Sequence, residues 1–192
     1  MENISVKGKE FEIIEQKGEH TYLVRRKGTT FFLRKFDNSG DFNHYVDSLK
    51  ALKGSGVPIP KIIRLDKKEL LLVSEFIRGL NIFDVVYEGR MDEKIYEKMF
   101  TNSYLARIDK ISLDWNPENW IYTGERIYYI STFFEKVTDD NVFVKHGIYQ
   151  WFYTKEFEET LKKKGLPLKP NLRKEDFVIN KEIVLMTVKY YH

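Results

Sequence analysis

The sequence contains no cysteine, which excludes a disulfide framework, a thiolate zinc site and a thiol nucleophile. It has no apolar run long enough to cross a bilayer, and its charged N-terminus lacks a signal-peptide core. It also has no block of five or six like charges, because the two signs are interspersed and the net charge is only +3. These absences predict a cytoplasmic protein. They leave nucleic-acid binding as an alternative supported only by the mild basic charge and scattered lysines among aromatic residues.

The residues that are present suit a folded chain of modest size. With 192 residues, of which 42% are hydrophobic and 15% aromatic, the chain can bury one good core or form two small lobes. Lysine and glutamate are abundant and glutamine is scarce, a composition that is typical of a thermophilic source.

The first 76 residues predict an antiparallel sheet with one helix. Aromatic, aliphatic and β-branched residues alternate with turn residues such as Gly18 and Lys27-Gly28, which favour hairpins. A stripe of apolar residues predicts a helix from Asp41 to Lys53. The predicted strands are Phe11–Ile14, Thr21–Arg26, Thr29–Phe36, Lys61–Leu65 and Glu69–Phe76.

After Phe76 the pattern becomes mainly helical. Helices are predicted over Asn81–Tyr87, Asp92–Ile108, Asn141–Phe152 and Lys155–Lys164, and a hairpin over Trp120–Tyr122 and Ile127–Ile130. The stretch Asp176–Tyr191 fits either a terminal helix or a strand followed by a helix. The sequence therefore predicts an α+β chain in two lobes, with an N-terminal lobe over 1–77 and a mainly helical C-terminal lobe over 78–192.

The segment 112–134 carries the main chemical motif. Asp114 and Asn119 lie five positions apart around Pro117 and precede the predicted hairpin. This arrangement resembles the catalytic loop of the protein-kinase-like superfamily, in which H-x-D-x-x-x-x-N comes before a hairpin that ends in a metal-binding Asp. Trp115 and Trp120 are interpreted as packing residues beside the loop.

Three further motifs resemble the aminoglycoside phosphotransferase and choline kinase branch of that superfamily. They are Gly56-Val57-Pro58-Ile59-Pro60, Glu75-Phe76-Ile77-Arg78-Gly79 and Leu105-Ala106-Arg107-Ile108-Asp109. The resemblance covers about Phe11 to Phe134 and implies a small, truncated, two-lobed kinase-like fold. It also implies an ATP-dependent phosphotransferase that transfers the γ-phosphoryl group to a hydroxyl of a small molecule or a protein.

The resemblance assigns roles to individual residues. Asp114 would be the general base, and Asn119 would bind Mg²⁺ through its amide oxygen. Gly18 lies in the turn Gln16–Thr21, which would cover the phosphates of ATP. The hinge residues Glu75, Phe76 and Ile77 would offer backbone groups to the adenine.

The phosphate-binding cation would be Arg34 or Lys35, and only one of the two can face the nucleotide because strand side chains alternate. The match to the family favours Arg34. The helix partner that orients this cation would be Asp47 or Asp41.

Two positions depart from the motif. Ser112 stands where the loop-supporting His belongs, and Ser131 stands where the second magnesium ligand, an Asp, belongs. A neutral hydroxyl is a poor substitute for a carboxylate at a magnesium site. The alternative hypothesis is therefore a catalytically impaired pseudokinase that acts as a nucleotide- or partner-binding module.

Overall fold

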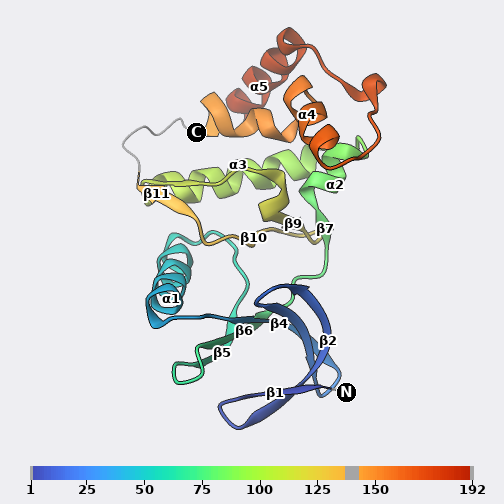
Figure 1. Cartoon of the computed structure of the whole chain (residues 1–192). Helices are drawn as coiled ribbons and strands as arrows, with labels where there is room; N and C mark the ends of the chain where they lie inside the picture. Colours follow the sequence, from blue (N-terminus) through green and yellow to red (C-terminus); the bar gives the residue numbers. More distant parts are fainter. Residues whose placement is uncertain (1, 137–142, 191–192) are drawn as a thin grey trace. The chain divides into compact units, whose positions relative to one another are not determined.

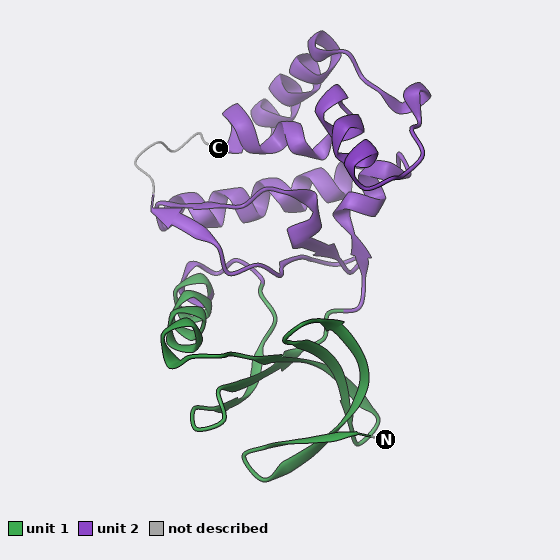
Figure 2. Ribbon diagram, viewed as in Figure 1, with its two compact units in different colours: residues 1–52, 59–77 green, residues 53–58, 78–192 purple. Residues whose placement is uncertain are grey.

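The computed structural model describes residues 2–136 and 143–190 (Figure 1). An antiparallel, curled sheet comes first and the helices follow, which confirms the predicted α+β class. The chain divides into two compact units (Figure 2), one of residues 1–52 and 59–77 and the other of residues 53–58 and 78–192. The break at Ile77 and Arg78 falls in the predicted hinge, whereas residues 53–58 group with the second unit instead of the first.

The first unit is built on a six-stranded antiparallel sheet in the order β1-β2-β3-β4-β6-β5. Its strands are β1 (Asn3–Val6), β2 (Lys9–Gly18), β3 (Thr21–Arg26), β4 (Thr29–Lys35), β5 (Ile62–Asp66) and β6 (Leu71–Glu75). Strand β1 was not predicted, because four residues are too short for a periodic pattern. The turn Lys27-Gly28 has φ angles of 48° and 78°, both positive, as the twist of a two-residue hairpin requires.

The sheet curls because β2 is irregular. Its pairing with β3 shifts register between Ile13 and Glu15 and again between Gln16 and Gly18, and such bulges bend a strand. The concave side encloses an apolar core of Val6, Phe11, Val24, Leu33, Leu71 and Val73.

Asp66 joins the first and last strands of the curled sheet. Its Oδ2 accepts a hydrogen bond from the N–H of Lys7 at 2.9 Å, and its Oδ1 accepts from the N–H groups of Lys68 and Glu69. These bonds, led by the one from Lys7, lower the pKa of the Asp66 carboxyl. The carboxylate therefore holds β1 against the β5–β6 turn.

The helix α1 (Ser39–Ser55) packs on the opposite face of the sheet. Its buried residues Phe42, Val46 and Leu49 contact Leu72, which points away from the inner core because side chains alternate along β6. The side chain of Asn38 accepts from the N–H of Asp41 at 2.9 Å and so caps the first turn.

The second unit contains short strands and most of the helices. Its elements are β7 (Leu80–Asn81), α2 (Ile82–Tyr87), α3 (Glu93–Ile108), β8 (Ile111–Leu113), β9 (Trp120–Tyr122), β10 (Ile127–Tyr129), β11 (Phe134–Lys136), α4 (Lys155–Lys163) and α5 (Asp176–Tyr190). The strands form two small sheets, β10-β9-β7 and β11-β8. Asp92 caps α3 and Thr154 caps α4, each accepting from the N–H three residues ahead.

The C-terminal part has one irregular segment where a helix was predicted and one helix where the prediction was open. The region predicted as a helix over 141–152 is not regular: Phe143–Gly147 forms a π-helical turn and Ile148–Trp151 a 3₁₀ turn, while residues 141–142 lie outside the described part. These turns bring the backbone of Gly147 against the indole of Trp115. The open choice at the C-terminus resolves as a helix, α5, with Tyr191 outside the described residues.

Within the residues that the structure describes, none of the helices has the length and apolar character needed to span a membrane.

Candidate functional site

The loop from Asp114 to Asn119 is closed by the carboxylate of Asp114. Oδ1 accepts from the N–H of Asn116 at 2.9 Å, and Oδ2 accepts from the side-chain amide of Asn119 at 2.8 Å. Asn116 in turn accepts from the N–H of Glu118 at 3.1 Å and caps the 3₁₀ turn Pro117–Asn119. The structure thus brings the predicted base, Asp114, and the predicted metal ligand, Asn119, into direct contact.

A stack of buried tryptophans supports this loop. The rings of Trp115 and Trp120 are parallel, with an interplanar angle of 6° and centroids 5.0 Å apart. Trp120 Nε1 donates to the carbonyl of Asp114 at 3.0 Å, and Trp151 Nε1 donates to the carbonyl of Trp115 at 2.8 Å. All three side chains are buried, so the interpretation of Trp115 and Trp120 as packing residues is confirmed.

Ser131 is held by neighbouring groups in its own segment. Its Oγ accepts from the N–H of Phe133 at 3.2 Å. Tyr129 donates to the carbonyl of Phe133 at 2.5 Å and accepts from the N–H of Asp114 at 3.2 Å. Asp114, Asn119 and Ser131 therefore lie in one hydrogen-bonded neighbourhood of the second unit.

The side chains in this neighbourhood do not form a usual magnesium site. The side-chain amide of Asn119 donates a hydrogen bond from its nitrogen to Asp114, which leaves the amide oxygen as the atom that would face a cation. Ser131 contributes only a hydroxyl that is already bonded. Among the described residues there is no group of three or more His, Cys, Asp or Glu side chains that could hold a metal ion, whereas magnesium in proteins prefers carboxylate oxygens.

A cavity of about 560 Å³ lies beside the loop, within the same unit. Asn116 and Pro117 form its loop side, and the paired rings of Phe83 and Phe157, with centroids 5.0 Å apart, form an apolar surface. Its polar groups include a hydrogen-bonded pair, Tyr149 and Asn180, and two exposed carboxylates, Glu156 and Asp176. The sequence did not predict this cavity, because its residues come from five separate segments and no local spacing reveals them.

The charge around the cavity is negative. Glu156 and Asp176 lie among its lining residues, and the described residues that line it include no lysine or arginine. Lys164, which lies over the ring of Phe83, is paired with Glu118 at 2.6 Å, so its charge is balanced outside the cavity.

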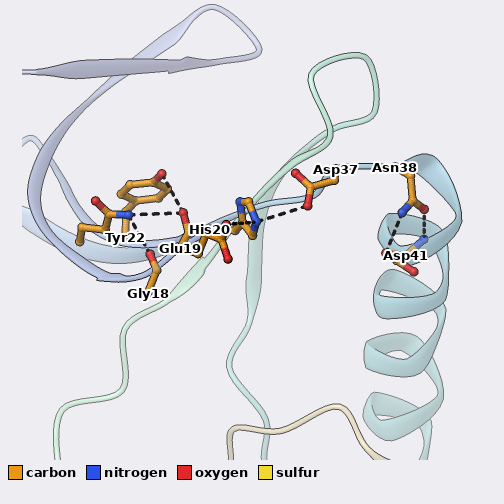
Figure 3. A network of polar contacts seen from close by, with 8 residues as sticks. Gly18, Glu19, His20, Tyr22, Asp37, Asn38 and Asp41 are labelled. Atoms are coloured by element: carbon orange, nitrogen blue, oxygen red, sulfur yellow. Dashed lines mark hydrogen bonds and ion pairs between the residues drawn. The ribbon is translucent and has the colours of Figure 1, made fainter.

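In the first unit, the predicted phosphate-binding turn is part of a polar network (Figure 3). Gly18 ends β2, and its carbonyl accepts from the side chain of Gln16 at 3.1 Å. His20 follows and lies 3.3 Å from a carboxylate oxygen of Asp37 and 3.9 Å from one of Glu19. The turn therefore carries acidic neighbours where a phosphate site favours cations.

Arg34 and Lys35, the two candidates for the phosphate-binding cation, differ in exposure, as neighbouring residues on a strand are expected to. Arg34 is half-buried, with its guanidinium 4.7 Å from the centre of the Tyr45 ring on α1, while Lys35 is exposed. Burial raises the pKa of Tyr45, and the nearby Arg34 partly offsets that rise.

The helix acids do not contact this cation. Asp47 is exposed and binds Lys50 at 2.8 Å, which lowers the pKa of its carboxyl, and Asp41 bonds to Asn38. The side chain that α1 presents to Arg34 is Tyr45, an aromatic ring in place of the predicted carboxylate.

The predicted hinge residues end the first unit. Glu75 closes β6, and its N–H donates to the carbonyl of Lys61 at 2.8 Å. Phe76 stacks on Phe32 with an interplanar angle of 15°, and Ile77 is half-buried.

A comparison of the sequence with models of known protein families found no match, and neither did a comparison with curated proteins.

Proposed function

We propose that this chain is a small kinase-like phosphotransferase, which moves the γ-phosphoryl group of ATP to a hydroxyl of a small molecule. The observation that carries the proposal is the 2.8 Å hydrogen bond between Asp114 and Asn119 in a closed loop ahead of the β9–β10 hairpin. The order of a curled antiparallel sheet with one helix, a hinge at Glu75–Ile77 and a mainly helical second unit is consistent with a truncated kinase-like fold.

Asp114 is the general base in this proposal. The acceptor hydroxyl oxygen bonds to the γ-phosphorus as the bond from phosphorus to the bridging oxygen of ADP breaks, and the hydroxyl proton passes to Asp114. Each carboxylate oxygen of Asp114 already accepts one hydrogen bond from its own loop. These bonds orient the carboxylate before the acceptor arrives.

The cavity beside the loop suits a small acceptor. Its volume of about 560 Å³ is in the range of small-molecule sites. Hydroxyl and amide groups line it together with Glu156 and Asp176, so the acceptor class that fits is a hydroxylated compound with a positive charge.

The residues assigned to the nucleotide follow from their positions in the kinase-like motifs. Arg34 is the cation assigned to the phosphates, Gly18 belongs to the turn assigned above them, and Glu75, Phe76 and Ile77 are assigned to the adenine. Any Mg²⁺ would enter with ATP, with Asn119 as the protein ligand.

A second candidate function is a pseudokinase that binds nucleotide or a partner without efficient transfer. The observation that favours it is the neutral hydroxyl of Ser131, which accepts a hydrogen bond from the N–H of Phe133. A hydroxyl used in this way adds no anionic ligand for a cation.

Thermal unfolding with ATP, with and without Mg²⁺, tests the nucleotide side and separates the two candidates. Far-ultraviolet circular dichroism follows the whole chain, including the first unit with the residues assigned to the nucleotide, whereas the three tryptophans lie in the second unit and their fluorescence follows that unit alone. A ligand at 100 times its Kd stabilises the folded state by about 2.7 kcal/mol. The phosphotransferase proposal expects stabilisation by ATP that increases with Mg²⁺ and falls in Asn119→Ala.

The pseudokinase alternative expects equal stabilisation with and without the metal, and a new magnesium dependence in Ser131→Asp. Absence of stabilisation by ATP, GTP or ADP at millimolar concentration refutes both the phosphotransferase and a pseudokinase that binds nucleotide.

A separate binding measurement tests the acceptor site. Glu156→Gln with Asp176→Asn is expected to weaken the binding of hydroxylated amines about 10-fold at low salt, because two unit charges near the ligand are removed. Neutral polyols of the same size should bind the variant and the wild type alike. Glu159→Gln is the matched control, since Glu159 lies on the same helix but is not among the residues that line the cavity.

A further inference from the structure

The hydroxyl of Tyr129 is the meeting point of the two segments that carry the candidate site residues. The side chain is fully buried, and its ring packs on Trp120 with centroids 4.7 Å apart. The hydroxyl contacts the backbone of the loop at Asp114 and the segment from Ser131 to Phe133. Burial raises its pKa, so this group stays protonated at neutral pH.

The donors and acceptors fix the direction of each bond. Tyr129 has one proton, which it donates to the carbonyl of Phe133 at 2.5 Å. Its oxygen accepts from the N–H of Asp114 at 3.2 Å. Ser131 accepts from the N–H of Phe133 at 3.2 Å, so the backbone of Phe133 contacts both hydroxyl groups.

We propose that Tyr129 is a positioning residue, whose hydroxyl fixes the backbone of Asp114 relative to the segment Ser131–Phe133. The connection consists of the protein's own hydrogen bonds, so it holds the base in place whether or not a cation is present. The inference rests on the proposed function for its catalytic consequence, but the bridge itself can be measured without activity.

Other contacts also join these segments. Strand β8 pairs with β11 as far as Leu113 and Phe134, next to the loop, and the N–H of Ile130 donates to the carbonyl of Asn119 at 2.9 Å. Asp114 is not among the paired strand residues, and its N–H donates to the Tyr129 hydroxyl. Tyr129→Phe therefore removes one oxygen atom, keeps the ring on Trp120, and leaves the N–H of Asp114 and the carbonyl of Phe133 without this partner.

The test compares Tyr129→Phe with Tyr128→Phe. The second variant removes a hydroxyl from the preceding residue, whose side chain lies on the opposite face of β10. Amide hydrogen exchange is followed residue by residue by NMR, with EDTA and with Mg²⁺. In the wild type, the N–H of Asp114 should be protected equally in both solutions. Tyr129→Phe should raise its exchange rate at least about 10-fold while amides of α3 stay unchanged, and Tyr128→Phe should change neither.

Kinetics supply the second arm. If the wild type transfers phosphate, Tyr129→Phe should lower kcat about 10-fold and change the KM for ATP less than about 2-fold, because only the position of the base is altered. An unchanged kcat with a faster-exchanging Asp114 overturns the positioning role. Unchanged exchange at Asp114 overturns the bridge. A wild type without transfer refutes the proposed function alone, since the exchange arm still decides the bridge.

If Tyr129→Phe does not fold, the wild type decides the bridge. The hydroxyl proton of Tyr129 should then exchange slowly and show a nuclear Overhauser effect to the N–H of Asp114. A rapidly exchanging hydroxyl proton would overturn the proposal.

Discussion

Gly147→Ala tests whether the backbone at position 147 supports the loop through Trp115. A Cβ at this position would lie 2.4 Å from Cδ1 and 2.6 Å from Cγ of the Trp115 ring, where ordinary contacts begin at 3.4 Å. The indole would have to move by about 1 Å (3.4 − 2.4). It has little room to do so, because Trp120 stacks on it at 5.0 Å and Phe143 packs on it at 4.4 Å.

Overpacking of this kind costs about 1–3 kcal/mol. In a chain of this size the midpoint temperature should fall by about 2–4 °C for each kcal/mol. Tryptophan fluorescence in urea or on heating is the assay, since all three tryptophans belong to this cluster or bond to it.

Gly54→Ala is the control for Gly147→Ala, because a Cβ at Gly54 meets nothing within 4 Å and the residue lies in α1. Alanine should be neutral or slightly stabilising there. Equal unfolding midpoints for Gly147→Ala and the wild type would refute the close contact and its support of Asp114.

Three further predictions concern other parts of the chain. Asp66→Asn should destabilise the first unit at pH 7, and the difference in unfolding free energy from the wild type should shrink as pH falls below about 4. The pKa of Asp66 is lower in the folded protein than in the unfolded chain. Its stabilisation is therefore present above the unfolded pKa and is lost as pH falls through the folded pKa. Urea unfolding followed by circular dichroism at several pH values measures this, and a difference independent of pH would contradict it. Asn102→Leu should cost about 1–3 kcal/mol in tryptophan-detected unfolding, because the buried amide donates to the carbonyl of Ile127 at 3.0 Å; an unchanged midpoint would show that this bond contributes little. Arg34→Met should weaken ATP binding, because the charge is lost while the methionine side chain can still pack on Tyr45. Equal ATP affinity of the variant and the wild type in a titration would show that Arg34 does not bind the phosphates.

Local patterns predicted the elements that position the loop. The bounds of β3 and β9 were predicted to the residue, and α3 was predicted to within one residue of its start, because each is defined by neighbouring residues and a turn or cap. The contact between Asp114 and Asn119 is similarly local, since only four residues separate them. A short spacing of polar residues around a proline is therefore informative without any tertiary structure.

Contacts between distant segments were not predictable from these patterns. Strand β11 pairs with β8, and the cavity beside the loop collects residues from α2, α4 and α5, but no period in the sequence connects them. Tyr129 was counted only as part of a β-rich run, because the sequence cannot reveal where its hydroxyl points. Asp47 or Asp41 was predicted as the partner of Arg34 because of its charge, whereas Tyr45 packs against Arg34 in the structure.

Phosphoryl transfer itself is the most direct test of the proposed function. Phosphorus NMR can follow ATP consumption by the wild type and Asp114→Asn in the presence of hydroxylated amines. We predict that ATP is consumed only when an acceptor is present, that a phosphorylated acceptor forms, and that Asp114→Asn lowers the rate by about 10²–10⁴-fold. Consumption at the same rate in Asp114→Asn, or no transfer by a wild type that binds ATP and an acceptor, would contradict the role of Asp114 as the base.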